Sequence, residues 1–153
     1  RDGTINVNKP EYPHKKEDFK FIPGVLPALK ELSKTDYKII IITNQSGVFR
    51  GYFTEKDLQE IHRYMLSKLK KAGVRIDKIY YCPHAPEQQC SCRKPRPGMI
   101  EKAVKDFGIN LSKSWMIGDS PRDMQMGKEV NLKTILIGEK VKNLKEAVKI
   151  IIS

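Results

Sequence analysis

The feature that most constrains the fold of this chain is a regular alternation of short apolar runs with amphipathic helical patterns. Residues 39–42 are four consecutive isoleucines, and such a β-branched run favours a strand buried on both faces. Strands that alternate with helices are typical of a parallel sheet covered by helices on both faces. The patterns predict strands at 38–43, 76–81, 115–117 and 134–137, and helices at 24–32, 54–73, 97–107, from 120, and at 144–152.

This alternation predicts an α/β protein with a single Rossmann-like, doubly wound parallel sheet. The chain has 153 residues, which is long enough for one hydrophobic core. Because we find no internal repeat, low-complexity tract or linker, we expect one domain over residues 1–153. The segment from 5 to 22 carries neither pattern and is predicted to be a long loop over the domain, and loops of that length are usually functional.

The charge balance limits the classes of partner. Lysine and arginine number 29 against 18 aspartate and glutamate residues, for a formal net charge of +11. This excess favours an anionic partner, such as nucleic acid, an acidic membrane or a phosphorylated metabolite, or it is a lysine-rich surface without a specific role.

The longest apolar run is too short to span a bilayer. All three cysteines lie between 82 and 92, which argues against a distributed disulfide framework and predicts a cytoplasmic location.

The cysteines and one histidine form the sharpest local motif. One residue separates Cys82 from His84, five residues follow His84, and one residue separates Cys90 from Cys92. Three thiolates and one imidazole at this spacing suit a closed tetrahedral Zn²⁺ site, which would be structural because four protein ligands leave no open position. Such a zinc would hold the loop that leads to Lys94. The alternative is a group of buried cysteines with an incidental histidine.

Polar side chains also follow several predicted strands at their carboxyl ends, where ligands collect in parallel sheets. Asp2 and Asp119 are placed to hold Mg²⁺ through carboxylate oxygens. The backbone amides after Thr43 suit a phosphate, and Lys94 would compensate its charge. Each residue alone also has an ordinary interpretation. Thr43 can belong to a turn, Lys94 to the surface charge, and Asp123 to a capping box that begins at the serine three residues before it.

Taken together, these motifs resemble the haloacid dehalogenase superfamily of phosphohydrolases. Within it, the resemblance is to the small histidinol-phosphate and heptose-bisphosphate phosphatases, and it covers essentially the whole chain. It implies a haloacid dehalogenase fold without a cap domain and with a zinc-binding loop. The segments that carry it are 2–6, 43–47, 50–51, 82–84, 90–95 and 118–119.

The chain resembles two branches of this subfamily that act on different substrates, and the choice between them remains open. Segments 45–53 and 93–99 resemble the heptose-bisphosphate enzymes, which implies removal of the 7-phosphate from a heptose 1,7-bisphosphate. The five-residue gap in the zinc motif resembles the histidinol-phosphate branch instead. A polynucleotide 3′-phosphatase is disfavoured because no basic and aromatic stripe is present, and a non-enzymatic zinc-containing binding module is the fourth hypothesis. The partner is therefore expected to be a small phosphorylated metabolite, with no membrane or nucleic acid, and the chain a monomer by default.

The resemblance also implies a mechanism. In this family the first motif is Asp-x-Asp and its first aspartate is the nucleophile, so counting back from Asp2 places the nucleophile immediately before Arg1. We therefore expect the natural chain to extend upstream. That aspartate would form an aspartyl-phosphate while Asp2 acts as general acid and then as general base. Mg²⁺ would be held by the nucleophile, the Asp2 backbone carbonyl and Asp119, with Asp123 supporting it, while Thr43 and Lys94 stabilise the phosphoryl group.

The remaining implied residues contact the substrate. The loop at 8–12 is one residue longer than usual in this family, and Ser120 stands where the heptose enzymes often carry lysine. His14 and His62 are predicted to be a loop residue and an exposed helix residue without a role. The substrate contacts implied by the resemblance are Asn8, Tyr12, Thr43, Asn44, Gln45, Ser46, Arg50, Arg93 and Lys94.

Overall fold

The computed structural model describes residues 1–9 and 15–153, so Tyr12 and His14 lie outside the described residues. Strands and helices alternate along the chain as predicted, and each predicted element is confirmed to within a few residues. The strands are β1 (Ile40–Asn44), β2 (Lys78–Cys82), β3 (Trp115–Gly118) and β4 (Lys133–Leu136). The α-helices are α1 (Val25–Leu32), α2 (Glu55–Lys71), α3 (Gly98–Phe107), α4 (Pro121–Glu129) and α5 (Leu144–Ile152), and short 3₁₀ helices occupy Lys16–Asp18, Pro86–Gln88 and Leu111–Lys113.

All the strand pairing in these elements is parallel, as predicted. β1 pairs with β2 and β3 pairs with β4. In the part of the chain that the structure describes, the strands therefore form two parallel pairs, whereas the sequence predicted one sheet. An apolar cavity of about 400 Å³ lies between the two pairs and is lined by residues of β1, β3 and α3.

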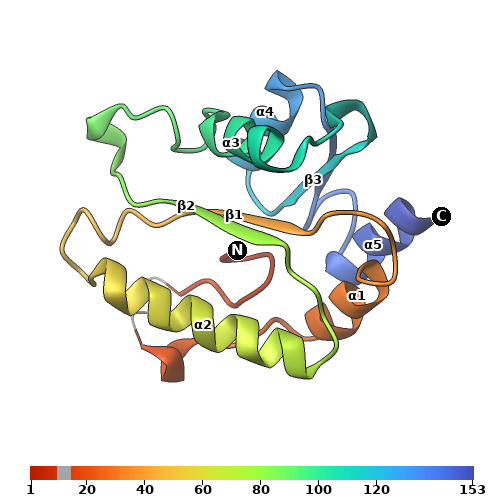
Figure 1. The fold of residues 1–153 in the computed structure, drawn as a ribbon, viewed down its shortest axis with the longest axis horizontal. Coiled ribbons are helices and arrows are strands. Elements are labelled where there is room, and N and C mark those ends of the chain that lie inside the picture. The colour runs from red at the N-terminus through yellow and green to blue at the C-terminus, as the bar shows by residue number, and fades with distance from the viewer. Residues whose placement is uncertain (10–14) are drawn as a thin grey trace.

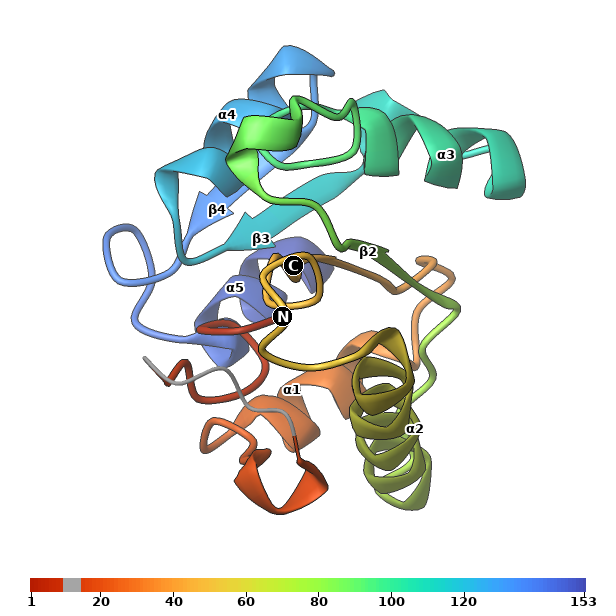
Figure 2. The same cartoon turned by 90° about the vertical axis from the view of Figure 1, so that its left-hand side faces the viewer.

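Helices cover both faces of the strands (Figures 1 and 2). α3 and α4 lie on one face, where α3 contacts β1 and β2 while α4 contacts β3 and β4. α1, α2 and α5 lie on the other face, and α1 packs directly against α5. This arrangement confirms the predicted α/β class. The prediction that the fold has no cap domain stays a prediction. Among the helices described here, none is both long and apolar enough to cross a bilayer.

Helix α2 shows how the sequence pattern produces the core. Thr54 caps its first turn by accepting a hydrogen bond from the backbone N–H of Asp57 at 3.1 Å. Leu58, Met65 and Leu69 follow on one helical face and are fully buried. Burial of an aliphatic side chain of this size contributes about 1.5–3 kcal/mol, so this face anchors the helix in the hydrophobic core.

The structure corrects one prediction on this helix, because His62 is buried rather than exposed. Its side chain is 7% exposed and lies near Tyr81, with 6.0 Å between the ring centroids. Burial, together with the positive charge of Arg1, lowers the pKa of His62 to about 3. The signal was present in the sequence, since His62 is four residues after Leu58 and three before Met65.

Candidate active site and zinc loop

A pocket of about 230 Å³ lies where β1 and β3 end. It gathers residues that are distant in the sequence, which is the arrangement expected at the carboxyl ends of parallel strands. Of the predicted site residues, those that line it are Asp2, Asn8, Thr43, Asn44, Lys94, Asp119 and Asp123.

Asp2 is held on both carboxylate oxygens. Its Oδ1 accepts hydrogen bonds from the Arg1 guanidinium at 3.0 Å and the Asn6 amide at 2.9 Å, and its Oδ2 accepts one from the Gln45 amide at 2.8 Å. Burial alone would raise the pKa of Asp2, but the Arg1 guanidinium and the two amide hydrogen bonds lower it. The ionised form is therefore favoured, as a group that accepts a proton from water requires.

Gln45 joins Asp2 to Thr43. Its side-chain nitrogen also donates to the Thr43 hydroxyl at 2.9 Å, so one amide positions two of the predicted catalytic groups. Gln45, Thr43 and Ser46 are all buried, and of these three only Thr43 lines the pocket. The predicted substrate contacts of Gln45 and Ser46 stay predictions, whereas the positioning contact of Gln45 is visible directly.

Sequence reasoning missed the part that Asn6 plays. Asn6 is fully buried, and its amide donates to Asp2 from four residues along the chain. It lies in the segment that resembles the family motif, but nothing in an isolated asparagine distinguishes a contact to a carboxylate from an ordinary turn.

Lys94 is held at both its side chain and its backbone. Its ammonium lies 2.7 Å from Asp123 Oδ1, and both groups are largely buried. The Asn44 side chain accepts from the Lys94 N–H at 3.0 Å and donates to the Lys94 carbonyl at 3.3 Å. Asn44 therefore clamps the Lys94 peptide to the end of β1, and its predicted substrate contact stays a prediction.

Asp123 completes the predicted capping box and also pairs with Lys94, whereas its predicted support of Mg²⁺ stays a prediction. Its Oδ2 accepts from the Ser120 N–H at 3.2 Å and from the Ser120 hydroxyl at 2.9 Å, as in a capping box at the start of α4. Its Oδ1 pairs with Lys94. Burial would raise the pKa of Asp123, but the adjacent Lys94 lowers it, so an ionised carboxylate holds the lysine in place.

Asp119 faces the loop that carries Asp2. Its Oδ1 accepts a hydrogen bond from the Thr4 hydroxyl at 3.1 Å. Gly3 lies against it with φ +79°, and a Cβ there would be 2.0 Å from Asp119 Oδ2, so only glycine allows this approach. The close packing brings the Asp2 and Asp119 carboxylates to one pocket. Oxygen donors of this kind fit Mg²⁺.

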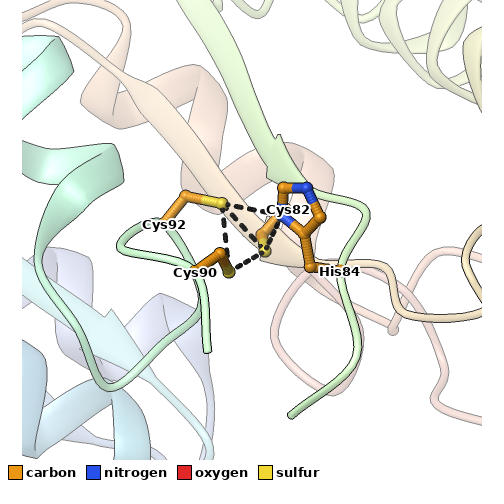
Figure 3. Close-up of side chains that lie close together, drawn as sticks. All are labelled: Cys82, His84, Cys90 and Cys92. Carbon is orange, nitrogen blue, oxygen red and sulfur yellow. Dashed lines mark hydrogen bonds between the residues drawn. The ribbon is translucent and has the colours of Figure 1, made fainter. Parts of the chain in front are cut away.

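The four predicted zinc ligands converge (Figure 3). Their ligand atoms all lie within 4.8 Å of one another, and Cys92 Sγ is 3.0 Å from Cys82 Sγ and 3.2 Å from His84 Nδ1. Zn–S bonds of about 2.3 Å place tetrahedral sulfur ligands roughly 3.8 Å apart. The three sulfur–sulfur distances here are 3.0, 3.5 and 3.5 Å, somewhat shorter than that separation. The three thiols of Cys82, Cys90 and Cys92 and the imidazole of His84 thus fit a structural zinc ion.

Two predicted arginines lie beside the zinc loop and do not line the pocket. Arg93 donates to the His84 carbonyl at 3.1 Å, so it ties together the two halves of the loop. Arg50 is exposed and lies 3.9 Å from Glu87, and an exposed pair of this kind contributes about 0–1 kcal/mol. The structure therefore brings neither guanidinium to the pocket, and their substrate contacts stay predictions.

Comparison with known proteins agrees with this geometry. The sequence model of the haloacid dehalogenase-like hydrolases matches residues 3–137. A D-glycero-beta-D-manno-heptose-1,7-bisphosphate 7-phosphatase of Helicobacter pylori is 45% identical over 138 residues, covering 90% of this chain and 79% of that protein. The alpha-anomer enzyme of Campylobacter jejuni is 41% identical, with coverages of 90% and 78%. The crystal structure of the D,D-heptose 1,7-bisphosphate phosphatase of B. bronchiseptica, complexed with magnesium and phosphate, has a TM-score of 0.92 at 28% identity and covers 99% of this chain and 94% of its own.

Proposed function

This chain belongs to the haloacid dehalogenase-like hydrolase family, and on that premise we propose that it removes the 7-phosphate from D-glycero-D-manno-heptose 1,7-bisphosphate. The observation that carries the proposal is the single pocket that unites Asp2, Thr43, Lys94 and Asp119 at the strand ends. The names of relatives at 41% and 45% identity support the choice of substrate.

In the proposed reaction, the nucleophilic aspartate forms a bond to phosphorus as the bond to the sugar oxygen breaks, and the protonated form of Asp2 gives its proton to that oxygen. The resulting Asp2 carboxylate then removes a proton from the water that attacks the aspartyl-phosphate and releases phosphate. Its contacts with Asn6 and Gln45 hold the carboxylate in one orientation for both steps. Thr43 and Lys94 orient the phosphoryl group and balance its charge, because phosphoryl transfer depends mainly on positioning and charge stabilisation. The nucleophile is the aspartate that the family resemblance places before Arg1.

Asp119 and the Asp2 segment would hold the Mg²⁺. When bound, that ion neutralises charge on the phosphoryl oxygens. The zinc has a separate part in the proposal, because Cys82, His84, Cys90 and Cys92 would hold it to stabilise the loop that leads into Lys94. We place the enzyme in the cytoplasm, where thiols stay reduced, and propose that it acts as a monomer.

One observation favours a second substrate. The five-residue gap between His84 and Cys90 resembles the histidinol-phosphate phosphatases, so histidinol phosphate is the alternative. Both substrates are phosphomonoesters, and the pocket chemistry described above serves either one.

The test is phosphate release by the chain extended upstream to carry the proposed nucleophile, with Mg²⁺ and each substrate in turn. We expect the value of kcat/KM for heptose 1,7-bisphosphate to exceed that for histidinol phosphate, with loss of activity when Mg²⁺ is removed. A preference for histidinol phosphate would make the zinc-loop spacing the better guide. Absence of Mg²⁺-dependent phosphate release from both would overturn the proposal.

A further inference from the structure

One cation at the pocket has no part in the reaction proposed above. Arg122 is the second residue of α4, is exposed, and lines the pocket. It was not among the residues predicted from the sequence. Ser120 and Asn8, which line the same pocket, are uncharged, and the Asp123 carboxylate that follows Arg122 in the chain is already paired with Lys94.

The other two cations of the pocket are already paired. The Arg1 guanidinium is buried and lies 3.0 Å from Asp2, and the Lys94 ammonium lies 2.7 Å from Asp123. Among residues 1–9 and 15–153, Arg122 has no carboxylate within ion-pair distance. Its charge is therefore available to a ligand, while the charges of Arg1 and Lys94 are partly neutralised.

The proposed substrate requires such a group. A bisphosphate carries two dianionic groups, and only one of them reacts between Asp2, Thr43 and Lys94. The second phosphate stays intact and needs its own counter-charge. A guanidinium offers several N–H donors in a planar fork that matches phosphate oxygens, and it keeps its charge at every physiological pH.

We infer that Arg122 binds the phosphate that is not hydrolysed, and that it thereby gives the site its preference for a bisphosphate over a monophosphate. This inference rests on the proposed function and deepens it. Arg122 is a specificity residue in this account, because it acts on the remote end of the substrate and leaves the reacting atoms to the residues deeper in the pocket.

The experiment compares R122Q with the unmodified natural chain on heptose 1,7-bisphosphate and on heptose 7-phosphate. K128Q is the matched control, since Lys128 lies on the same helix, is exposed and does not line the pocket. We expect R122Q to lower the ratio of the two kcat/KM values, bisphosphate over monophosphate, by about 10–100-fold, the usual value of hydrogen bonds to a charged group. R122K, which keeps the charge without the fork, should recover part of the ratio.

Each other outcome is decisive. If the unmodified chain hydrolyses neither sugar phosphate, the proposed function fails. If it hydrolyses the bisphosphate but shows no preference over the monophosphate, or if R122Q has the same ratio as K128Q, only the inference about Arg122 is overturned. Circular dichroism and zinc content of R122Q verify that a changed ratio does not arise from misfolding.

Discussion

The zinc loop and the pocket at the strand ends are built in opposite ways. The four zinc ligands come from one segment of eleven residues, from Cys82 to Cys92. The pocket joins residues as far apart as Asp2 and Asp123. The zinc ligands come together when the short segment from Cys82 to Cys92 folds back on itself. The pocket forms only when β1, β3 and the N-terminal segment have packed against one another.

The two regions meet at Lys94. This residue follows the zinc loop by two positions, its ammonium reaches into the pocket, and Asn44 fixes its backbone to β1. A loop stabilised by local ligands thus delivers one charge to a site assembled by the whole fold. A zinc ion held by these four ligands would lower the entropy of the loop, while hydrogen bonds across the fold place the charge of Lys94.

The largest effect is expected from Asp2→Asn, which removes the proposed acid and base from the pocket and leaves the zinc loop untouched. We expect kcat to fall by about 10²–10⁴-fold, the usual value of general acid–base catalysis. Steady-state kinetics measures the loss, and the zinc content should not change. Asp36→Asn is the control, because Asp36 is exposed and does not line the pocket. Retention of more than a tenth of the activity would count against the role of Asp2.

Cys90→Ser tests the other region. Removal of a ligand should lower zinc affinity by more than the roughly 10–100-fold typical of changes to the partners of metal ligands. With the loop loosened, we expect a lower melting temperature and a higher KM, with the affinity for Mg²⁺ retained. Metal analysis, thermal unfolding and kinetics measure these changes, and Ser91→Ala in the same loop is the control. An unchanged KM after verified loss of zinc would show that the zinc loop does not affect substrate binding in the pocket.

Gln45→Met tests the amide that joins Asp2 to Thr43. The hydrogen bond from Gln45 lowers the pKa of Asp2, so its removal should raise that pKa. The limb of the pH profile of kcat/KM that reports ionisation of Asp2 should move to higher pH. The value of kcat/KM itself should fall by about 10–100-fold, since an unsatisfied buried group costs about 1–3 kcal/mol. The control is Gln125→Met on the exposed side of α4. An unmoved limb with a raised KM would indicate a substrate contact instead.

The smallest effect is expected from Asn44→Ala, which removes the hydrogen bonds between the Asn44 side chain and the Lys94 backbone. Two hydrogen bonds of about 0.5–1.5 kcal/mol each hold the Lys94 backbone, so we expect roughly a tenfold fall in kcat with little change in KM. Combined with Cys90→Ser, the effects should be non-additive, because both changes act through the position of Lys94. Additive effects would show that zinc and Asn44 act independently.

The sequence alone determined the features that depend on neighbouring residues. The isoleucines of β1, the capping residue Thr54 and the apolar face of α2 all lie within one element, and the structure confirms them. The zinc motif belongs to the same group, because its ligands are close in the chain. His62 was misplaced even though its spacing to Leu58 was informative, since histidine is compatible with either environment.

Only the tertiary structure decided which polar groups meet. That Gln45 positions Asp2, that Asn6 supports it, and that Asn44 clamps Lys94 are contacts between segments that no spacing rule links. The charge of Arg122 at the pocket, which has no ion-pair partner among residues 1–9 and 15–153, likewise depends on how α4 is placed against the end of β3. Local patterns set the free energy of each element, whereas hydrogen bonds between distant side chains form only after packing has fixed their separation.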